Sequence, residues 1–391
     1  MVDEREAERS QEPIGILDVP MTAWLELFYD LVFVAAILVL SDAVSHLHDG
    51  VRVTRVVVVF SALWLVWLAT TLFANRYRVQ DFVHRMLVLA QMFLVALVAI
   101  EAHAGVEHDA ASLAVTYTGL VGTVAIMYTR AAYHQTGGRV DTRFRAIVAW
   151  ISSALFAVSI AVPWPGKTIL WIAGATALVV STFARGGLIG PTEDADIDPR
   201  HLVERMGAFT IIVCGEAFVK VAIAVSGSSL IEVDVVALFF QFVLTFAIWT
   251  SYFEDVPHAG IRRGRLYAWI VLHLFLQIAI AGTAIGVAKL VKIGPLDHLD
   301  AEEILEITGT LAGVYLALAG IGPCTRRLPT RPLLTLRLAA AFLVVVVGVS
   351  AWAIDSAELL EGVAALSVVA VVYAAFSYRM TARTEIAPLD A

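Results

Sequence analysis

The chain has 391 residues, of which 59% are hydrophobic and 16% are charged, and its mean hydropathy is +0.81. Soluble domains average about 45–50% apolar and about 25% charged residues, so this composition excludes a soluble enzyme and a disordered chain. The formal net charge of -8 argues against a nucleic-acid partner, because proteins that bind nucleic acid present basic surfaces.

Twelve apolar segments follow one another along the chain, and each approaches the roughly 20 residues that a helix needs to cross a bilayer. Glycine and proline residues fall between them, where helices are expected to end. We therefore predict an all-α polytopic membrane helix bundle of about twelve transmembrane helices. The segments cover residues 24–46, 53–73, 82–102, 112–132, 144–163, 168–184, 201–226, 233–253, 266–288, 303–321, 333–354 and 358–378.

Lysine and arginine residues are unevenly distributed between alternate loops. Of the 27 basic residues, 21 lie in the termini and in the loops or helix edges of one side, and 5 lie on the other side. The positive-inside rule assigns the basic side to the cytoplasm, so both termini are predicted to be cytoplasmic. The expected division is a tail over 1–23, six-helix halves over 24–190 and 191–380, and a tail over 381–391.

The two predicted halves resemble each other in the charged residues that open their first, third and fifth helices. Six helices per half is an even number, so both halves would insert in the same orientation and form a parallel six-plus-six repeat. The alternative is that apolar sequences resemble one another by chance. The matched residues, 178–186 positions apart, are Glu26 with Glu204, Arg85 with Arg265, and Arg145 with Arg331.

Four polar side chains fall near the middle of predicted membrane helices. An ionisable residue there costs about 2.5–3.5 kcal/mol on the insertion scale, so it normally has a partner or a function. Glu216 and Lys220 are four residues apart, as are His273 and Gln277, so each pair shares a helix face. We expect these four side chains to face a shared cavity that handles a proton or an ion. The alternative is a set of structural contacts that lock the bundle.

The first predicted helix carries two carboxylates, Glu26 and Asp30, one turn apart near its cytoplasmic edge. They could bind a cation. The alternative is that arginines at the same level hold them in ion pairs, which is the more common arrangement for a carboxylate. The residues considered for such a structural charge clamp are Glu204, Arg205, Arg85 and Arg265.

Signs of metal or covalent chemistry are weak. His201 and Glu204 have the i, i+3 spacing of a helical metal pair, but two ligands do not make a site. Cys214 and Cys324 lie far apart within apolar segments and predict no disulfide. Because no nucleophile–base pair or three-ligand metal set is recognisable, we expect no enzyme activity, no metal and no cofactor.

Two stretches of sequence carry a family resemblance. Residues 25–37, LELFYDLVFVAAI, and residues 201–216, HLVERMGAFTIIVCGE, resemble the two signature segments of the bacterial low temperature requirement A family. The pattern Arg265-Leu-Tyr followed by His273 is also similar to that family. The resemblance implies an integral protein of the bacterial plasma membrane and implies no particular activity.

These observations favour a secondary transporter of an unidentified ion or small solute. The alternatives are a cation channel and a non-transporting membrane protein that supports envelope function at low temperature. The expected partners are the lipid bilayer and that unknown solute or ion, with no nucleic acid. The sequence leaves the oligomeric state open.

Overall fold

The computed structural model describes residues 21–45, 50–77, 79, 81–104, 110–134, 140–183, 197–226, 235–254, 256, 260–262, 264–292, 301–326, 330–354 and 359–385. This part of the chain forms twelve α-helices and contains no strand beyond an isolated bridge between Ile261 and Thr325. The predicted all-α membrane bundle is therefore confirmed.

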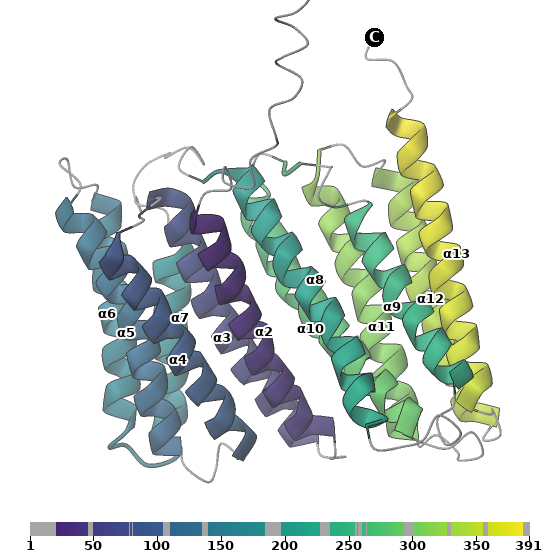
Figure 1. The fold of residues 1–391 in the computed structure, drawn as a ribbon, viewed down its shortest axis with the longest axis horizontal. Coiled ribbons are helices and arrows are strands. Elements are labelled where there is room, and N and C mark those ends of the chain that lie inside the picture. The colour runs from purple at the N-terminus through teal and green to yellow at the C-terminus, as the bar shows by residue number, and fades with distance from the viewer. Residues whose placement is uncertain are drawn as a thin grey trace, which may run out of the picture.

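The helices form two groups that follow the order of the chain (Figure 1). The first group is α2 (Met21–Ser45), α3 (Gly50–Tyr77), α4 (Phe82–Ala104), α5 (Ala110–His134), α6 (Val140–Ser159) and α7 (Gly166–Phe183). The second is α8 (Pro199–Ala224), α9 (Val235–Phe253), α10 (Leu266–Lys292), α11 (Ala301–Ile321), α12 (Thr330–Ile354) and α13 (Leu359–Glu385), with a short 3₁₀ turn, η2 (Gly322–Cys324).

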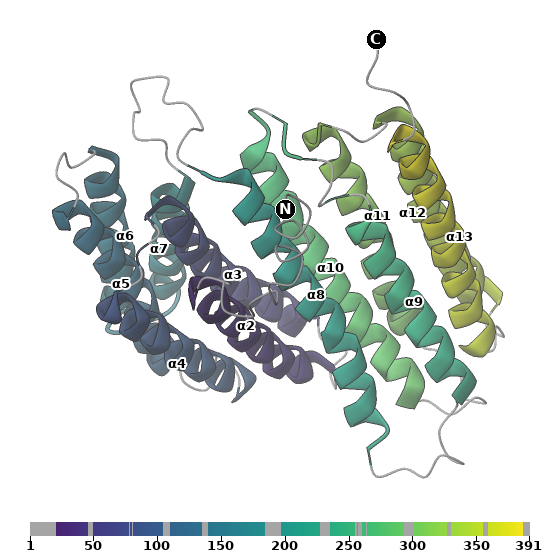
Figure 2. The ribbon, with the colours of Figure 1, turned by 45° about the horizontal axis from the view of Figure 1, so that its top comes forward.

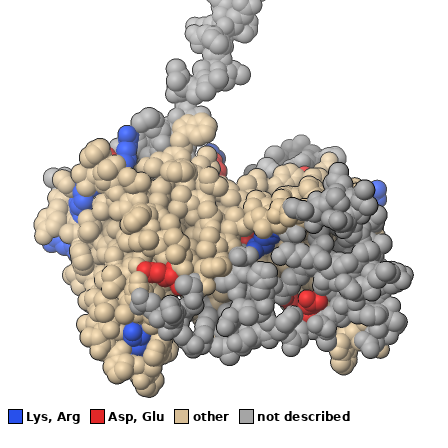
Figure 3. All heavy atoms as spheres, turned by 60° about the horizontal axis from the view of Figure 1, so that its bottom comes forward, with Lys and Arg blue, Asp and Glu red and all other residues tan. Residues whose placement is uncertain are grey.

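The length and composition of these helices suit a bilayer. Eight of them contain a stretch of at least 18 residues that is long and apolar enough to cross one, and α9 and α13 contain shorter apolar stretches. Large apolar side chains such as Phe93, Phe246 and Phe342 point outward and are each more than 60% exposed. Over the described part of the face in Figure 3, charged side chains are few and scattered. This surface is that of a multi-pass membrane protein, in which lipid covers the apolar exterior.

The two groups meet through four helices. In the first group α2 and α3 contact α8 and α10 of the second, and Figure 2 shows α8 and α10 side by side at this boundary. The predicted boundary near residue 190 lies outside the described residues. Helix α2 begins at Met21 and α13 ends at Glu385, so helix extends into both segments that were expected to be tails.

Neighbouring helices follow the same order within each group. In the first, α2 contacts α4, which contacts α5, then α6, then α7, while α3 contacts α7. In the second, α8 contacts α10, which contacts α11, then α12, then α13, while α9 contacts α13. The second helix of each group thus closes against the sixth.

Close packing between α10 and α11 depends on two glycines. A Cβ atom added at Gly282 would lie 2.6 Å from Cγ2 of Thr310, and one added at Gly286 would lie 2.6 Å from Cγ1 of Ile307. Small residues four positions apart allow two membrane helices to approach each other closely. This contact helps to fix α10, which carries His273 and Gln277, against its neighbours.

Candidate functional site

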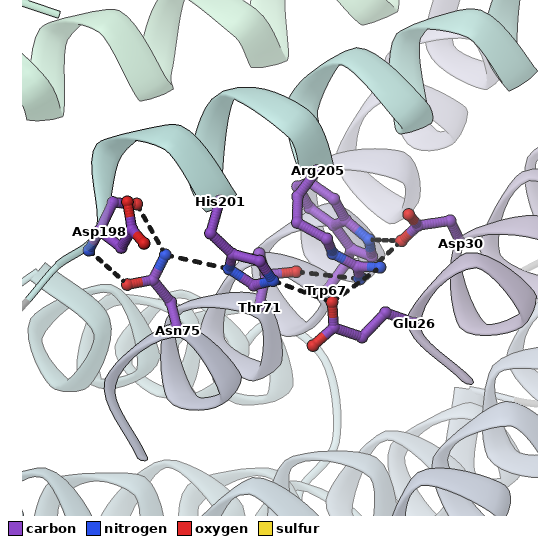
Figure 4. Close-up of polar contacts among 8 residues, drawn as sticks. All are labelled: Glu26, Asp30, Trp67, Thr71, Asn75, Asp198, His201 and Arg205. Carbon is purple, nitrogen blue, oxygen red and sulfur yellow. Dashed lines mark hydrogen bonds and ion pairs between the residues drawn. The ribbon is translucent and has the colours of Figure 1, made fainter. Parts of the chain in front are cut away.

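Polar side chains join the two groups of helices where α2 and α3 face α8 (Figure 4). At the centre, the side chain of Asp30 is fully buried. Its Oδ1 atom lies 2.8 Å from Nη2 of Arg205 and accepts a 2.6 Å hydrogen bond from Nε1 of Trp67. We call the whole set the junction network; its members are Glu26, Asp30, Trp67, Thr71, Asn75, Asp198, His201 and Arg205.

The outer part of the junction network is the pair formed by Glu26 and His201. Oε2 of Glu26 lies 2.9 Å from Nε2 of His201, and both side chains are partly exposed, at 18% and 28%. Glu26 precedes Asp30 by four residues, and His201 precedes Arg205 by four. One helical turn on each side therefore places two acid–base pairs one above the other, an outer pair and a buried pair.

Asn75 holds the start of α8 against α3. Its amide nitrogen donates to the backbone oxygen of Asp198 at 2.9 Å, and its amide oxygen accepts from the backbone nitrogen of Asp198 at 2.8 Å. The side chain of Asp198 caps α8 by accepting from the backbone nitrogen of Arg200, and Pro199 suits the first turn. The same Asn75 amide lies 3.1 Å from Nδ1 of His201, which leaves Nε2 to donate to Glu26.

The buried ion pair has hydrogen-bonding capacity to spare. Oδ2 of Asp30, and Nε and Nη1 of Arg205, have no hydrogen-bond partner among the described residues. Nη1 lies 3.9 Å from Oε2 of Glu26, which is an ion-pair distance but too long for a hydrogen bond. The guanidinium group also lies 5.9 Å from the ring centre of Trp67, within reach of a cation–π contact. Buried polar atoms are usually paired, so these atoms are available for a further hydrogen bond or, at Oδ2 of Asp30, for a proton.

His273 and Gln277 contact other partners. His273 donates from Nδ1 to the backbone oxygen of Trp269 at 2.7 Å and lies 3.1 Å from the hydroxyl of Tyr252 on α9. Gln277 donates to Thr210 of α8 at 3.2 Å and accepts from Nε1 of Trp64 on α3 at 2.6 Å. Gln277 thus links both groups of helices, in the layer below the junction network.

Glu216 and Lys220 lie on α8, in its second half. They are buried and 3.8 Å apart, as expected for an i, i+4 pair. Helix α8 begins at Pro199, so Glu216 is 17 residues along the helix, about 26 Å at 1.5 Å per residue. The position of Glu216 at the membrane midplane stays a prediction.

The structure contains a cavity between α8, α9 and α10, and none of the four side chains expected to share one lines it. Its volume is about 10 Å³, which is near the lower limit for one water molecule. Gln277 and Glu216 also lie at different levels, because Thr210, which bonds to Gln277, lies six residues before Glu216 on α8, about 9 Å along the helix axis. The residues lining the cavity are Cys214, Ala217, Gln241, Leu244, Thr245, Ile248, Ile280, Thr283, Ala284 and Val287.

Comparison with known proteins identifies the family. The family model described as bacterial low temperature requirement A protein (LtrA) matches residues 22–375, nearly the whole chain. The chain belongs to the LtrA family. It is also 29% identical over 245 residues to an uncharacterized protein of Rhizobium meliloti (strain 1021), covering 61% of this chain and 59% of that protein. The chain thus matches about three fifths of the length of this curated relative.

The two segments that resemble the LtrA signature meet in the junction network. Residues 25–37 lie in α2 and supply Glu26 and Asp30, whereas residues 201–216 lie in α8 and supply His201 and Arg205. They are about 175 residues apart in the chain, and the ion pairs between them join the two groups of helices. The part of the sequence that resembles the LtrA family most specifically therefore builds one site.

The predicted charge clamp is correct for one arginine. Arg205 contacts both Glu26 and Asp30. Glu204 and Arg265 are exposed, Arg85 is half-exposed, and none of the three takes part in the described contacts of the network. Glu204 does not take part in the clamp, because it lies 100° from Arg205 around α8 and the two side chains cannot both face α2.

Sequence reasoning missed the neutral members of the network. Trp67, Thr71 and Asn75 lie on one face of α3 at intervals of four residues, which could have identified a polar stripe. His201 was considered only as half of a metal pair with Glu204. Its partner in the structure is Glu26, which no local spacing could have indicated.

Proposed function

We propose that this LtrA-family protein is a secondary transporter for a small solute or ion, and that the junction network couples its two groups of helices. The observation that carries the proposal is the buried ion pair between Asp30 of α2 and Arg205 of α8. Replacing a buried ion pair with apolar residues is often neutral or stabilising, so stability alone does not explain charges at this place. Charged groups within a membrane commonly mark the path of an ion or substrate.

We also propose that the two groups of helices are halves of a parallel repeat. One supporting contact joins the second helix of each group to the third helix of the same group. Thr70 donates to Gln91 at 3.2 Å in the first group, and Tyr252 lies 3.1 Å from His273 in the second. Tyr252 follows Thr70 by 182 residues, and His273 follows Gln91 by the same number. The helices of both groups also follow the same order of neighbours.

A second contact supports the repeat and changes one of its expected pairs. Arg145 is buried at the start of α6 and donates to the backbone oxygen of Ser181 on α7. Arg337 is buried about two turns into α12 and donates to the hydroxyl of Tyr373 on α13. Both residues of the second pair follow those of the first by 192 positions, so Arg337, rather than Arg331, is the counterpart of Arg145 in this proposal.

We further propose that the protein lies in the bacterial plasma membrane with both termini in the cytoplasm. The support is the excess of arginine on one side of the predicted helices. The network lies near the start of α2 and of α8, so this orientation puts its exposed end at the cytoplasmic side. Glu26 and His201 would then exchange ions with the cytoplasm.

Purified full-length protein in liposomes tests the function. Potassium, sodium and ammonium salts, amino acids and sugars are applied outside, and a pH-sensitive dye and electrical recording report flux. A transporter gives saturable uptake that depends on an ion gradient. Discrete single-channel currents would support the cation channel instead, and a lack of flux with every solute would favour the non-transporting alternative.

A further inference from the structure

We infer that the junction network binds and releases one proton, and that protons are therefore the coupling ion of the transporter proposed above, on which the coupling role rests. The argument begins with the charges of its four ionisable side chains. Glu26 and Asp30 contribute two negative charges, whereas Arg205 contributes one fixed positive charge. With His201 neutral, the cluster holds one uncompensated negative charge. A buried net charge is strongly unfavourable, and one bound proton removes it.

The surroundings favour a proton over a metal cation. A metal ion requires several oxygen ligands, whereas a proton requires one acceptor atom. Around Asp30, Oδ1 is already occupied by Nη2 of Arg205 and by the indole of Trp67, both of which are donors. Oδ2 has no described partner and is the one free acceptor of that carboxylate. A cation placed there would also lie close to the guanidinium group, which would repel it.

Among the described residues, few other ionisable groups lie near the network. His84 of α4 is close enough to Glu26 for its charge to act on that carboxylate, and the ring of His84 stacks on the ring of Phe73. From α2, Tyr29 donates to Gln91 of α4. From α10, His273 is bonded to Trp269 and Tyr252.

Helices α3 and α8 complete this inventory. The network members on α3, namely Trp67, Thr71 and Asn75, are neutral. Arg76, next to Asn75, donates to the hydroxyl of Tyr128 on α5 at 3.4 Å. On α8, Glu204 is exposed and outside the network. The carboxylate of Asp198, just before α8, accepts from the backbone of Arg200 at the helix start.

The geometry provides a route for the proton between water and the buried carboxylate. Glu26 and His201 are partly exposed, and Asp30 lies one turn deeper. Arg205 already contacts both carboxylates, at 2.8 Å from Asp30 and 3.9 Å from Glu26. When Asp30 gains a proton on Oδ2, its attraction for the guanidinium falls, and Arg205 moves to Glu26 and displaces His201. Loss of the proton reverses the move, and Arg205 stays charged throughout.

This switch acts across the boundary between the two groups of helices. The bond that weakens on protonation joins α2 to α8, and the bond that strengthens joins the same two helices one turn nearer the surface. Proton binding would thus shift the contact between the groups along α2 by one turn. Such a shift is the kind of two-state change that couples ion binding to a rearrangement of helices.

The test uses full-length protein in lipid nanodiscs and difference infrared spectroscopy during a change from neutral to acidic pH. We expect a band from a protonated carboxylic acid that is lost in Asp30→Asn and kept in the control Glu204→Gln. We also expect tryptophan fluorescence to titrate over the same pH range and to lose that change in Trp67→Phe. If Asp30→Asn fails to fold, Asp30→Glu should retain the band at a shifted position.

The outcomes separate this inference from the proposed function. If Asp30→Asn retains every carboxylic acid band of the wild type, Asp30 is not the proton-binding group and the inference is wrong. A titration midpoint that moves when potassium or sodium chloride replaces choline chloride at equal ionic strength would show competition by a metal cation, and would also overturn it. If the band titrates as expected but liposomes show no pH-driven flux, the proton site stands and the transporter proposal fails.

Discussion

At the scale of single residues, Arg205 carries the largest share of the interactions in the junction network. Arg205→Met would leave Asp30 buried without a cation, so we expect a loss of about 3–5 kcal/mol in unfolding free energy, as for other broken buried pairs. Thermal unfolding in detergent measures this as a lower Tm. The matched control, Arg265→Met, removes an exposed arginine directly before α10 and should leave Tm unchanged. Equal Tm values for both variants would contradict the central role of Arg205.

The combination of Asp30→Leu with Arg205→Met refines that prediction. Because both charges are then absent, the double variant should recover most of the stability lost in Arg205→Met. Recovery would indicate that the penalty arises from an unpaired carboxylate. A double variant that is less stable than either single variant would instead indicate that the ion pair itself stabilises the bundle.

Asp81 predicts a pH dependence outside the membrane helices. A hydrogen bond from Arg130 at 2.7 Å, followed by one from the backbone nitrogen of His84, lowers the pKa of Asp81. A carboxylate with a lowered pKa stabilises the fold above its unfolded pKa, about 3.9, and that contribution disappears as the pH falls through the folded value. The side chain is half exposed, so the effect should be small.

Asp81→Asn checks this contribution. At neutral pH the variant should unfold at a slightly lower temperature than the wild type, and the two Tm values should converge as the pH falls below about 4. A difference in Tm that persists unchanged at acidic pH would show that the carboxylate charge is not the cause.

The sequence identified the charged members of the junction network better than its neutral members. Charges such as Asp30 and Arg205 are conspicuous because a membrane helix rarely carries them without a reason. Asn75 and Thr71 carry no such signal, since neutral polar residues are common in membrane helices. Which arginine meets which carboxylate also depends on the packing of helices far apart in the chain. For that reason Arg205 was found in the network, whereas Arg85 and Arg265 were not.

At the scale of helices, the contact between α10 and α11 should be sensitive to side-chain size. Gly282→Val places two methyl groups where a Cβ atom alone would already lie 2.6 Å from Thr310, so we expect overpacking to cost about 1–3 kcal/mol. Gly309→Ala on α11 is the control, because a Cβ atom there meets nothing within 4 Å. Thermal unfolding should separate the two. A Gly282→Val protein as stable as the control would show that the helices are not held this closely.

Hydropathy predicted each of the α-helices in the described part of the chain but misplaced some of their ends. The predicted segment 53–73 is the helix Gly50–Tyr77, and the segment 201–226 is the helix Pro199–Ala224. Polar turns at the ends of membrane helices lower the local hydropathy while remaining helical. Asn75 and the start of α8 lie in such turns, so the site was built partly from residues that the apolar pattern left out.

At the scale of the whole molecule, orientation is open to a direct check. A reporter that is active only in the periplasm should be inactive when fused after Ala391 and active when inserted between Ala104 and Ala110. The reason is the arginine excess on the side that carries the termini. The reverse activities would place the exposed end of the junction network outside the cell, and entry of ions from the cytoplasm at Glu26 and His201 would be wrong.

The arrangement of the two groups could not be read from the sequence. Hydropathy gives the number of helices, but the contact of α2 and α3 with α8 and α10 arises from tertiary packing. The expected cavity around Glu216 and His273 assumed that side chains at similar depth face one another. Instead, His273 bonds to Tyr252 and Trp269, while Gln277 bonds to Trp64 and Thr210.

The central claim is that Asp30, buried between the two groups of helices, couples ion movement to transport. The most direct measurement is flux driven by an imposed pH gradient in liposomes that contain equal amounts of folded wild type, Asp30→Asn or Glu204→Gln protein. The account predicts flux for the wild type and for Glu204→Gln, and a loss of at least tenfold for Asp30→Asn, corresponding to about 1.4 kcal/mol or more. Equal flux for Asp30→Asn and the wild type would contradict the account.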